Sequence, residues 1–221
     1  MSRPRIGLVH ALHASIAPVE AAFAEGWPEA ETVSLYDQSL YLDYNAFGGA
    51  SAEISARVAA LLAHSAACGA RAILFTGSLF GAAVEAARPQ LRVPVLASYE
   101  AMIEAAFRRG SRLGLIATVP DTARLMAADI HGYAERQGLA CELQTRLVDG
   151  AMAALQQGDG QRHDALVAAA ATALADCDAL LLSQFSMAPV LRQLPENLAA
   201  RTLTAPAAAV AKIRELLKGQ V

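Results

Sequence analysis

Two apolar runs in this sequence end abruptly in small polar residues that could act on a ligand. AILF at 72–75 is followed by TGS at 76–78, and ALLL at 179–182 is followed by SQ at 183–184. We expect each run to be a strand of a parallel sheet, because such strands are buried on both faces and read as continuous apolar segments. Ligands of α/β proteins bind beyond the carboxyl ends of these strands.

Hydroxyl groups around the two strand ends, and others at the helix start that follows residues 112–117, could bind a small anion. Backbone N–H groups at the start of the following helices point the same way, and together they can hold a carboxylate or phosphate without a basic side chain. Ordinary capping of helix N-termini is the alternative role for such residues. Their occurrence at duplicated positions favours an anion site. The candidate substrate-binding residues are Thr76, Ser78, Thr118, Thr122, Ser183 and Ser186.

His10 ends another short apolar run, at residues 5–10. A histidine at the carboxyl end of a strand could be a general acid or base, or could donate a hydrogen bond to a substrate. It could equally be a structural partner of a backbone carbonyl. The remaining histidines are scattered, without an H-x-x-x-H motif or a cluster with cysteine, so we expect no metal site.

The elements that would position these residues recur at a constant spacing. RLGLIA at 112–117 echoes RIGLVH at 5–10 with an offset of 107 residues, and Ala179 follows Ala72 by the same offset. Strands alternate with helices, which is typical of parallel sheets with right-handed crossovers. The sequence therefore predicts an α/β fold of two pseudo-symmetric, doubly wound parallel-sheet halves with the active-site cleft between them. We expect the first half to comprise residues 1–97 plus 206–221 and the second residues 98–205.

Two stretches lack a clear period and are predicted to be loops. The longer is 36–50, which contains Asp37, Asp43 and a Gly-Gly pair, and we expect it to lie over the ligand edge because long loops in compact domains are often functional. The other is the polar, glycine-containing stretch 149–160. Ser51 is expected to cap the helix that follows the longer stretch.

Composition and charge argue against several classes of protein. The net charge is −3 and no basic run exceeds a pair, which disfavours nucleic-acid binding. No apolar stretch approaches the roughly 20 residues of a membrane span, and the start of the sequence lacks a signal-peptide pattern, so a soluble cytoplasmic protein is expected. No phosphate-loop or dinucleotide motif is present, and we expect no cofactor. The three cysteines show no C-x-x-C spacing and are expected to be buried, reduced thiols.

In their order along the chain, these motifs resemble the aspartate/glutamate/hydantoin racemase superfamily, which includes arylmalonate decarboxylase and maleate isomerase. The resemblance rests on five segments, at residues 6–11, 73–78, 114–118, 180–186 and 204–206. It implies a cofactor-independent site between two similar α/β halves. It also implies one cysteine at each of two strand ends, where one thiolate removes the α-proton and the other thiol returns a proton to the opposite face. Relatives often form dimers or larger assemblies, so a homo-oligomer stays open.

This sequence departs from that pattern at both cysteine positions, which correspond to Gly77 and Gln184. Neither residue exchanges a proton near neutral pH, so two-thiol racemisation is disfavoured. The Gly77-Ser78 pair resembles arylmalonate decarboxylase, in which glycine replaces the first thiol, but that enzyme keeps the second cysteine.

Two functions therefore stay open. One is an isomerase, racemase or decarboxylase that acts on an amino acid, hydantoin or dicarboxylate through an enolate-like intermediate. His10 would be its acid or base, and Gln184 would donate a hydrogen bond. The other is a small-carboxylate binding or sensing protein that has lost both catalytic thiols.

Overall fold

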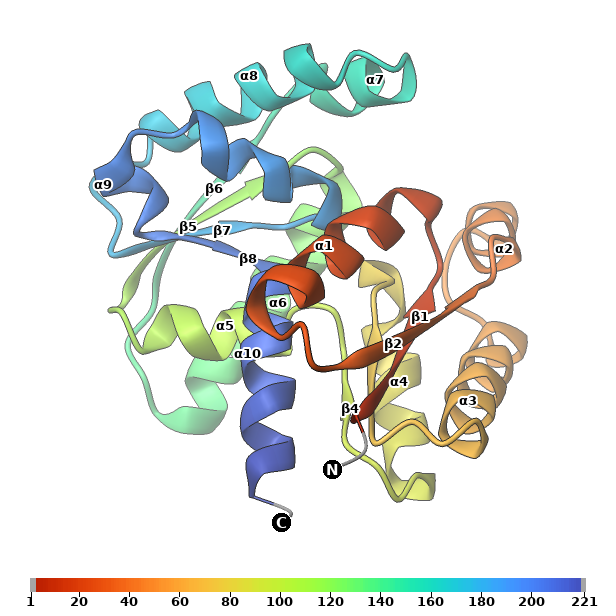
Figure 1. Ribbon diagram of the computed structural model, residues 1–221. Coiled ribbons are helices and arrows are strands. Elements are labelled where there is room, and N and C mark those ends of the chain that lie inside the picture. Colours follow the sequence, from red (N-terminus) through yellow and green to blue (C-terminus); the bar gives the residue numbers. More distant parts are fainter. Residues whose placement is uncertain (1–2, 220–221) are drawn as a thin grey trace. The chain divides into compact units, whose positions relative to one another are not determined.

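The computed structural model describes residues 3–219, which form two compact α/β units (Figure 1). One unit contains the described residues up to Glu100 together with those from Ala209 onward, and the other is Ala101–Ala208. Each unit is built around its own four-stranded sheet, and every strand pair in both sheets is parallel. The predicted α/β fold of two parallel-sheet halves is confirmed.

The first unit has the strand order β2-β1-β3-β4. Its strands are β1 (Arg5–His10), β2 (Glu31–Tyr36), β3 (Ala72–Phe75) and β4 (Val95–Leu96). In the register of the central strands, Val9 lies beside both Leu35 and Phe75, so His10 and Thr76 emerge at the same edge of the sheet. Its helices are η1 (His13–Ser15), α1 (Ile16–Gly26), α2 (Ser39–Phe47), α3 (Ala52–Ala67), η2 (Ser78–Phe80), α4 (Gly81–Ala87) and η3 (Arg88–Gln90).

Helix α3 shows how the sequence fixes local packing in this unit. Ser51 caps it by accepting a hydrogen bond from the Ile54 N–H, as predicted. Its buried residues recur at helical spacing and form the face that packs on the sheet. Gly7 of β1 permits this close approach, because a Cβ at that position would collide with the Ser65 hydroxyl.

The prediction of a loop at residues 36–50 is wrong for its central part, which forms the helix α2. Leu40 is fully buried, and Tyr41 and Tyr44 place their rings edge-on to Phe80 at centroid distances of 5.5 and 5.7 Å. The helix ends at Gly48, whose left-handed φ of 70° suits glycine. Tertiary contacts with the aromatic cluster therefore stabilise a helix that the local sequence pattern does not reveal.

The second unit has the strand order β6-β5-β7-β8, the same arrangement as the first. Its strands are β5 (Arg112–Ala117), β6 (Glu142–Leu147), β7 (Ala179–Leu182) and β8 (Thr202–Thr204). Its helices are α6 (Pro120–Gln137), α7 (Ala151–Gln156), α8 (Gly160–Thr172), η4 (Phe185–Gln193) and α9 (Glu196–Ala199). Two further helices, α5 (Glu100–Phe107) and α10 (Ala205–Lys218), run across the limits of the units.

The second unit repeats the packing of the first at several equivalent positions. Gly114 of β5 stands 107 residues after Gly7, and a Cβ there would lie 3.2 Å from Cys177 Sγ and 2.5 Å from Leu180 Cδ2. The predicted loop at 149–160 is wrong in part, because α7 occupies its centre and buries Ala151 and Ala154. Among the described residues, no helix has the length and apolar character needed to cross a bilayer.

Candidate ligand site at the strand ends

His10, Ser15 and Thr76 form a buried hydrogen-bonded cluster at the carboxyl ends of β1 and β3. His10 Nδ1 lies 2.9 Å from Ser15 Oγ and 3.1 Å from Thr76 Oγ1. The two hydroxyl oxygens are 2.9 Å apart. The Ser15 hydroxyl also donates to the Leu12 carbonyl oxygen at 2.7 Å. Strand pairing therefore brings two of the predicted site residues together, and the turn after β1 adds a third residue, Ser15.

The hydrogen bonds of this cluster fix the tautomer of His10. A carbonyl oxygen can only accept, so the single hydroxyl hydrogen of Ser15 is committed to Leu12. Ser15 Oγ is then an acceptor toward His10, and we assign the ring hydrogen to Nδ1. The Nε2 atom consequently carries a lone pair, and it is buried without a hydrogen-bond partner.

Burial also sets the charge of His10. Its side chain is fully buried, and desolvation lowers its pKa to about 4. The ring is therefore neutral near pH 7, where it can accept a hydrogen bond through Nε2. A base with this pKa is poorly matched to removing a carbon-bound proton at neutral pH, because efficient general bases have pKa values near the working pH.

Gly77, which we expected from the family resemblance to stand where the first thiol lies, is enclosed by its neighbours. A Cβ on this residue would lie 2.6 Å from the ring of Phe75, 2.6 Å from the ring of Phe80 and 3.0 Å from Ala11 Cβ. All three of these residues are buried. The space that a cysteine side chain would enter is therefore filled by packed apolar groups.

Ser78 follows Gly77 at the start of η2, and its hydroxyl meets a residue that the sequence did not single out. Tyr41 of α2 places its hydroxyl 3.3 Å from Ser78 Oγ. Burial raises the pKa of Tyr41, and the hydrogen bond to Ser78 offsets part of that rise. The Tyr41 hydroxyl is thus protonated at neutral pH and available as a donor.

Gln184, which we expected from the family resemblance to stand where the second thiol lies, forms a hydrogen-bonded network in the second unit. Its Oε1 accepts from the Thr118 N–H at 3.1 Å and from the Ser183 hydroxyl at 2.7 Å. Its Nε2 donates to Thr118 Oγ1 at 2.6 Å. The strand pairing of β5 with β7 brings these three predicted residues together. The amide occupies the end of β7 as an anchored, neutral hydrogen-bonding group.

The two remaining predicted residues of this unit lie on the elements that follow these strands. Thr122 is buried in the first turn of α6, and Ser186 is half-buried in η4. Thr122 stands 107 residues after Ser15, so the internal repeat contained a signal for the residue that sequence reasoning missed. By the same offset Thr118 corresponds to Ala11; Ala11 lies beside Gly77, and Thr118 contacts Gln184.

Other candidate groups lie elsewhere in the fold. Asp37 and Asp43 form ion pairs with Arg57 at 3.6 and 2.7 Å. The prediction of buried cysteines is wrong for Cys68, which is exposed, and for Cys141, which is only partly buried, whereas Cys177 is buried. In the part of the chain that the structure describes, no group of three or more histidine, cysteine or acidic side chains could hold a metal ion.

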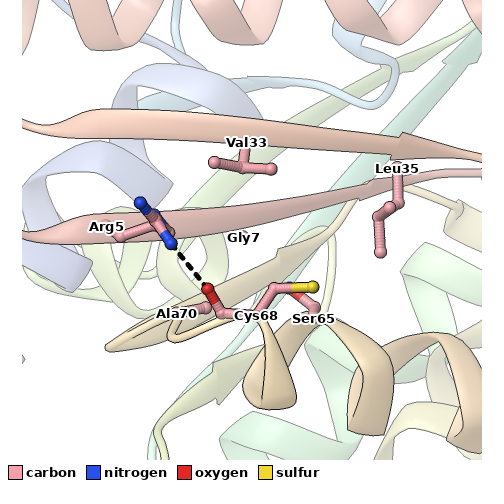
Figure 2. A pocket seen from close by; sticks show the side chains of 7 residues that line it. All are labelled: Arg5, Gly7, Val33, Leu35, Ser65, Cys68 and Ala70. Carbon is pink, nitrogen blue, oxygen red and sulfur yellow. Dashed lines mark hydrogen bonds between the residues drawn. The ribbon is translucent and has the colours of Figure 1, made fainter.

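One small pocket lies near the amino end of β1, between β2 and α3 (Figure 2). Arg5 lines one end of it and donates to the Cys68 carbonyl oxygen at 2.7 Å. The cavity volume is about 10 Å³, which admits at most a single water molecule. This pocket is at the opposite edge of the sheet from His10 and Thr76, and it is too small for a metabolite.

The arrangement of the strand ends agrees with a match to a family model, Asp/Glu/Hydantoin racemase, over residues 17–213. The chain belongs to this family. No curated protein matches the sequence significantly.

Solved structures share the fold of this family member. Allantoin racemase from Klebsiella pneumoniae superposes with a TM-score of 0.76 at 20% identity, covering 99% of this chain and 89% of that one. Glutamate racemase from Bacillus anthracis gives 0.70 at 15% identity, with 100% and 84% covered. Arylmalonate decarboxylase gives 0.69 at 18% identity, with 99% and 94% covered.

Proposed function

We propose that this racemase-family protein binds a small carboxylate without exchanging the ligand's α-proton. The observation that supports this proposal is the surroundings of Gly77 and Gln184, the residues expected at the two cysteine positions. Packed rings enclose Gly77, and the Gln184 amide is held by Thr118 and Ser183. Neither position offers a group that can take up and return a proton near neutral pH.

The properties of His10 support the same proposal. With its pKa at about 4, it is a weak base at neutral pH, and its Nδ1 hydrogen is engaged by Ser15 and Thr76. It is the strongest remaining candidate for an acid or base among the predicted site residues. Because His10 is buried and neutral and serves as a hydrogen-bonding group, the predicted site offers no base strong enough to remove a proton from the ligand.

Carboxylate binding is assigned to donors at the end of β7. Gln184 Nε2 has two hydrogens and uses one for Thr118, so the second can be donated to a ligand oxygen. Ser186, half-buried in η4, supplies a hydroxyl two residues later. In the first unit we assign the same role to the hydroxyls of Ser78 and Tyr41.

The test is proton NMR of the purified protein in D2O with four probes: allantoin, glutamate, aspartate and phenylmalonate. We chose them because similar folds occur in an allantoin racemase, a glutamate racemase, an aspartate racemase homologue and an arylmalonate decarboxylase. We expect saturation transfer to at least one of the three carboxylates, glutamate, aspartate or phenylmalonate, with its α-proton signal unchanged after prolonged incubation and no decarboxylated product. Allantoin has no carboxylate and serves as the comparison, to which we expect weaker transfer. Loss of an α-proton signal, or release of carbon dioxide, would contradict the proposal and favour the isomerase or decarboxylase alternative.

A pair of serine variants tests where the probe binds. Ser186→Ala removes the assigned hydroxyl and should weaken binding by about tenfold or more, because a hydrogen bond to a charged group contributes about 1.5–3 kcal/mol. Ser111→Ala is the matched control, because Ser111 precedes β5 at the amino edge of the same sheet. Equal affinities of the two variants would show that the carboxylate binds elsewhere.

A further inference from the structure

Strand β6 forms an open outer edge of its sheet. It pairs only with β5, and five of its six residues are exposed. The other sheet edges are better protected: β4 and β8 are short and buried, and β2 is half-buried along much of its length. An exposed edge strand presents unpaired backbone N–H and C=O groups and is a template for another strand.

The pairing with β5 determines which backbone groups of β6 face outward. Glu142 N donates to Ser111 O and Val148 N donates to Ala117 O, each at 2.8 Å. Backbone direction alternates along a strand, so the even-numbered residues between them also point toward β5. The N–H and C=O groups of Leu143, Thr145 and Leu147 therefore point away from the sheet, where a further strand could meet them.

The side chains of β6 are self-complementary in charge. Glu142, Gln144 and Arg146 share one face of the strand because side chains alternate with a period of two. In an antiparallel pair related by a twofold axis at Gln144, Glu142 of each copy lies directly opposite Arg146 of the other. Arg146 makes no ion pair with any residue that the structure describes, so it is available for this contact.

We propose that β6 pairs antiparallel with β6 of a second copy of this chain, with Gln144 on the twofold axis. In this register the outward backbone groups of Leu143 meet those of Thr145 of the second copy. Leu147, which is 43% exposed in the single chain, would lie opposite Cys141 of the second copy and be covered by it. The two β5–β6 sheets become one continuous sheet, and two ion pairs form symmetrically.

Two features argue for a second copy rather than for a protected edge. Natural edges are commonly blocked by charged side chains, lysine above all, or by proline; β6 contains no lysine or proline, and its two charged residues are opposite in sign and would face each other across the twofold axis. The equivalent strand β2 carries Glu31 without any basic residue, so the same pairing there would bring no compensating charge. The complementary pair is therefore a specific property of β6 and not of the repeated fold.

Charge reversal of the full-length protein tests the ion pairs, with sedimentation equilibrium as the measurement. We expect a concentration-dependent dimer whose dissociation constant rises by about tenfold or more in Arg146→Glu, because like charges then face each other twice. The double variant Glu142→Arg/Arg146→Glu restores opposite charges across the axis and should recover the dimer. A monomer at every concentration, or a dimer that is unaffected by Arg146→Glu, would overturn the proposal.

Disulfide trapping tests the register. Residues opposite each other in a non-hydrogen-bonded antiparallel pair have Cα atoms about 4.5 Å apart, within the range that a disulfide spans. In a Cys68→Ser/Cys141→Ser background, Gln144→Cys should form a covalent dimer under mild oxidation. Thr145→Cys is the control, because its own counterpart would lie on a diagonal about 7–8 Å away. More efficient trapping at position 145 than at 144 would refute this register.

Discussion

Gly77 and Gln184 occupy equivalent places after β3 and β7, yet their surroundings have diverged in opposite directions. In the first unit Ala11 and two phenylalanine rings fill the space beside a glycine. In the second unit Thr118 corresponds to Ala11 and holds a long amide through two hydrogen bonds. Gly77 and Gln184 are thus each matched by their neighbours, one by packed rings and the other by hydrogen bonds.

The enclosure of Gly77 predicts a cost for any side chain there. Gly77→Ala should lower the free energy of unfolding by about 1–3 kcal/mol, because Phe75 and Phe80 would have to move within a packed core. Gly81→Ala is the control, since its Cβ would meet nothing within 4 Å and alanine favours the helix. Urea denaturation of both variants checks this, and equal stabilities would show that the position is not enclosed.

His10 predicts a pH dependence of stability. Its folded pKa of about 4 is below the unfolded value of 6.5, so between these pH values the unfolded chain binds a proton that the folded chain does not. The free energy of unfolding should therefore fall as the pH drops from 7 to 4, by about 3 kcal/mol from this residue. His10→Gln should lack this component, as denaturation at several pH values would show. Parallel pH profiles for both proteins would be the contrary result.

Residue types and spacing identified most members of the clusters around His10 and Gln184. They did not predict the hydrogen bonds and packing of these residues. The apolar strands ending in Thr76 and Ser183 predicted where the hydroxyls would emerge, because parallel strands align their carboxyl ends. The commitment of Gln184 to Thr118 depends on side-chain conformations across strands 66 residues apart. The enclosure of Gly77 depends on ring positions. Neither has a signature in the local sequence.

At the level of elements, the helix α2 is the main feature that the sequence pattern did not predict. Its residues are mixed aromatic, polar and acidic, so no clear apolar stripe separates helix from loop. Its stability comes from packing on Phe80 and from Arg57 of α3, which pairs with Asp43 within α2 and with Asp37 just before it. The strands, in contrast, are recognisable because burial on both faces makes them uniformly apolar.

Removing the Arg57 ion pairs should loosen α2 without unfolding the unit. In Arg57→Met we expect amide hydrogen exchange at 39–47 to accelerate severalfold, since partly exposed ion pairs contribute up to about 1 kcal/mol. Arg124→Met removes an exposed pair with Asp121 in α6 and serves as the control. If exchange in α2 is the same in both variants, the tyrosine packing alone holds the helix.

At the level of the whole molecule, the shared strand order and the 107-residue offset of β1 with β5 and β3 with β7 lead us to infer an internal duplication. The sequence could predict this architecture because repeated strand motifs are local. It could not show how the two units differ in the segments of chain that complete them. The first unit includes a returning C-terminal segment, in which Val210, Ile213 and Leu217 are buried, whereas the second is continuous in sequence.

This difference predicts that the units will behave differently when separated. A fragment of residues 100–208 retains all four strands of its sheet and a cluster of buried residues that are all its own, so it should unfold cooperatively in urea. A fragment of residues 1–100 lacks α10, whose Arg214 donates to the Gly26 carbonyl oxygen and whose Val210 side chain packs beside Gly26. It should show a broader transition at lower denaturant concentration. Adding residues 205–219 as a peptide should then raise its midpoint, whereas a cooperative 1–100 fragment that is indifferent to the peptide would show that α10 is dispensable.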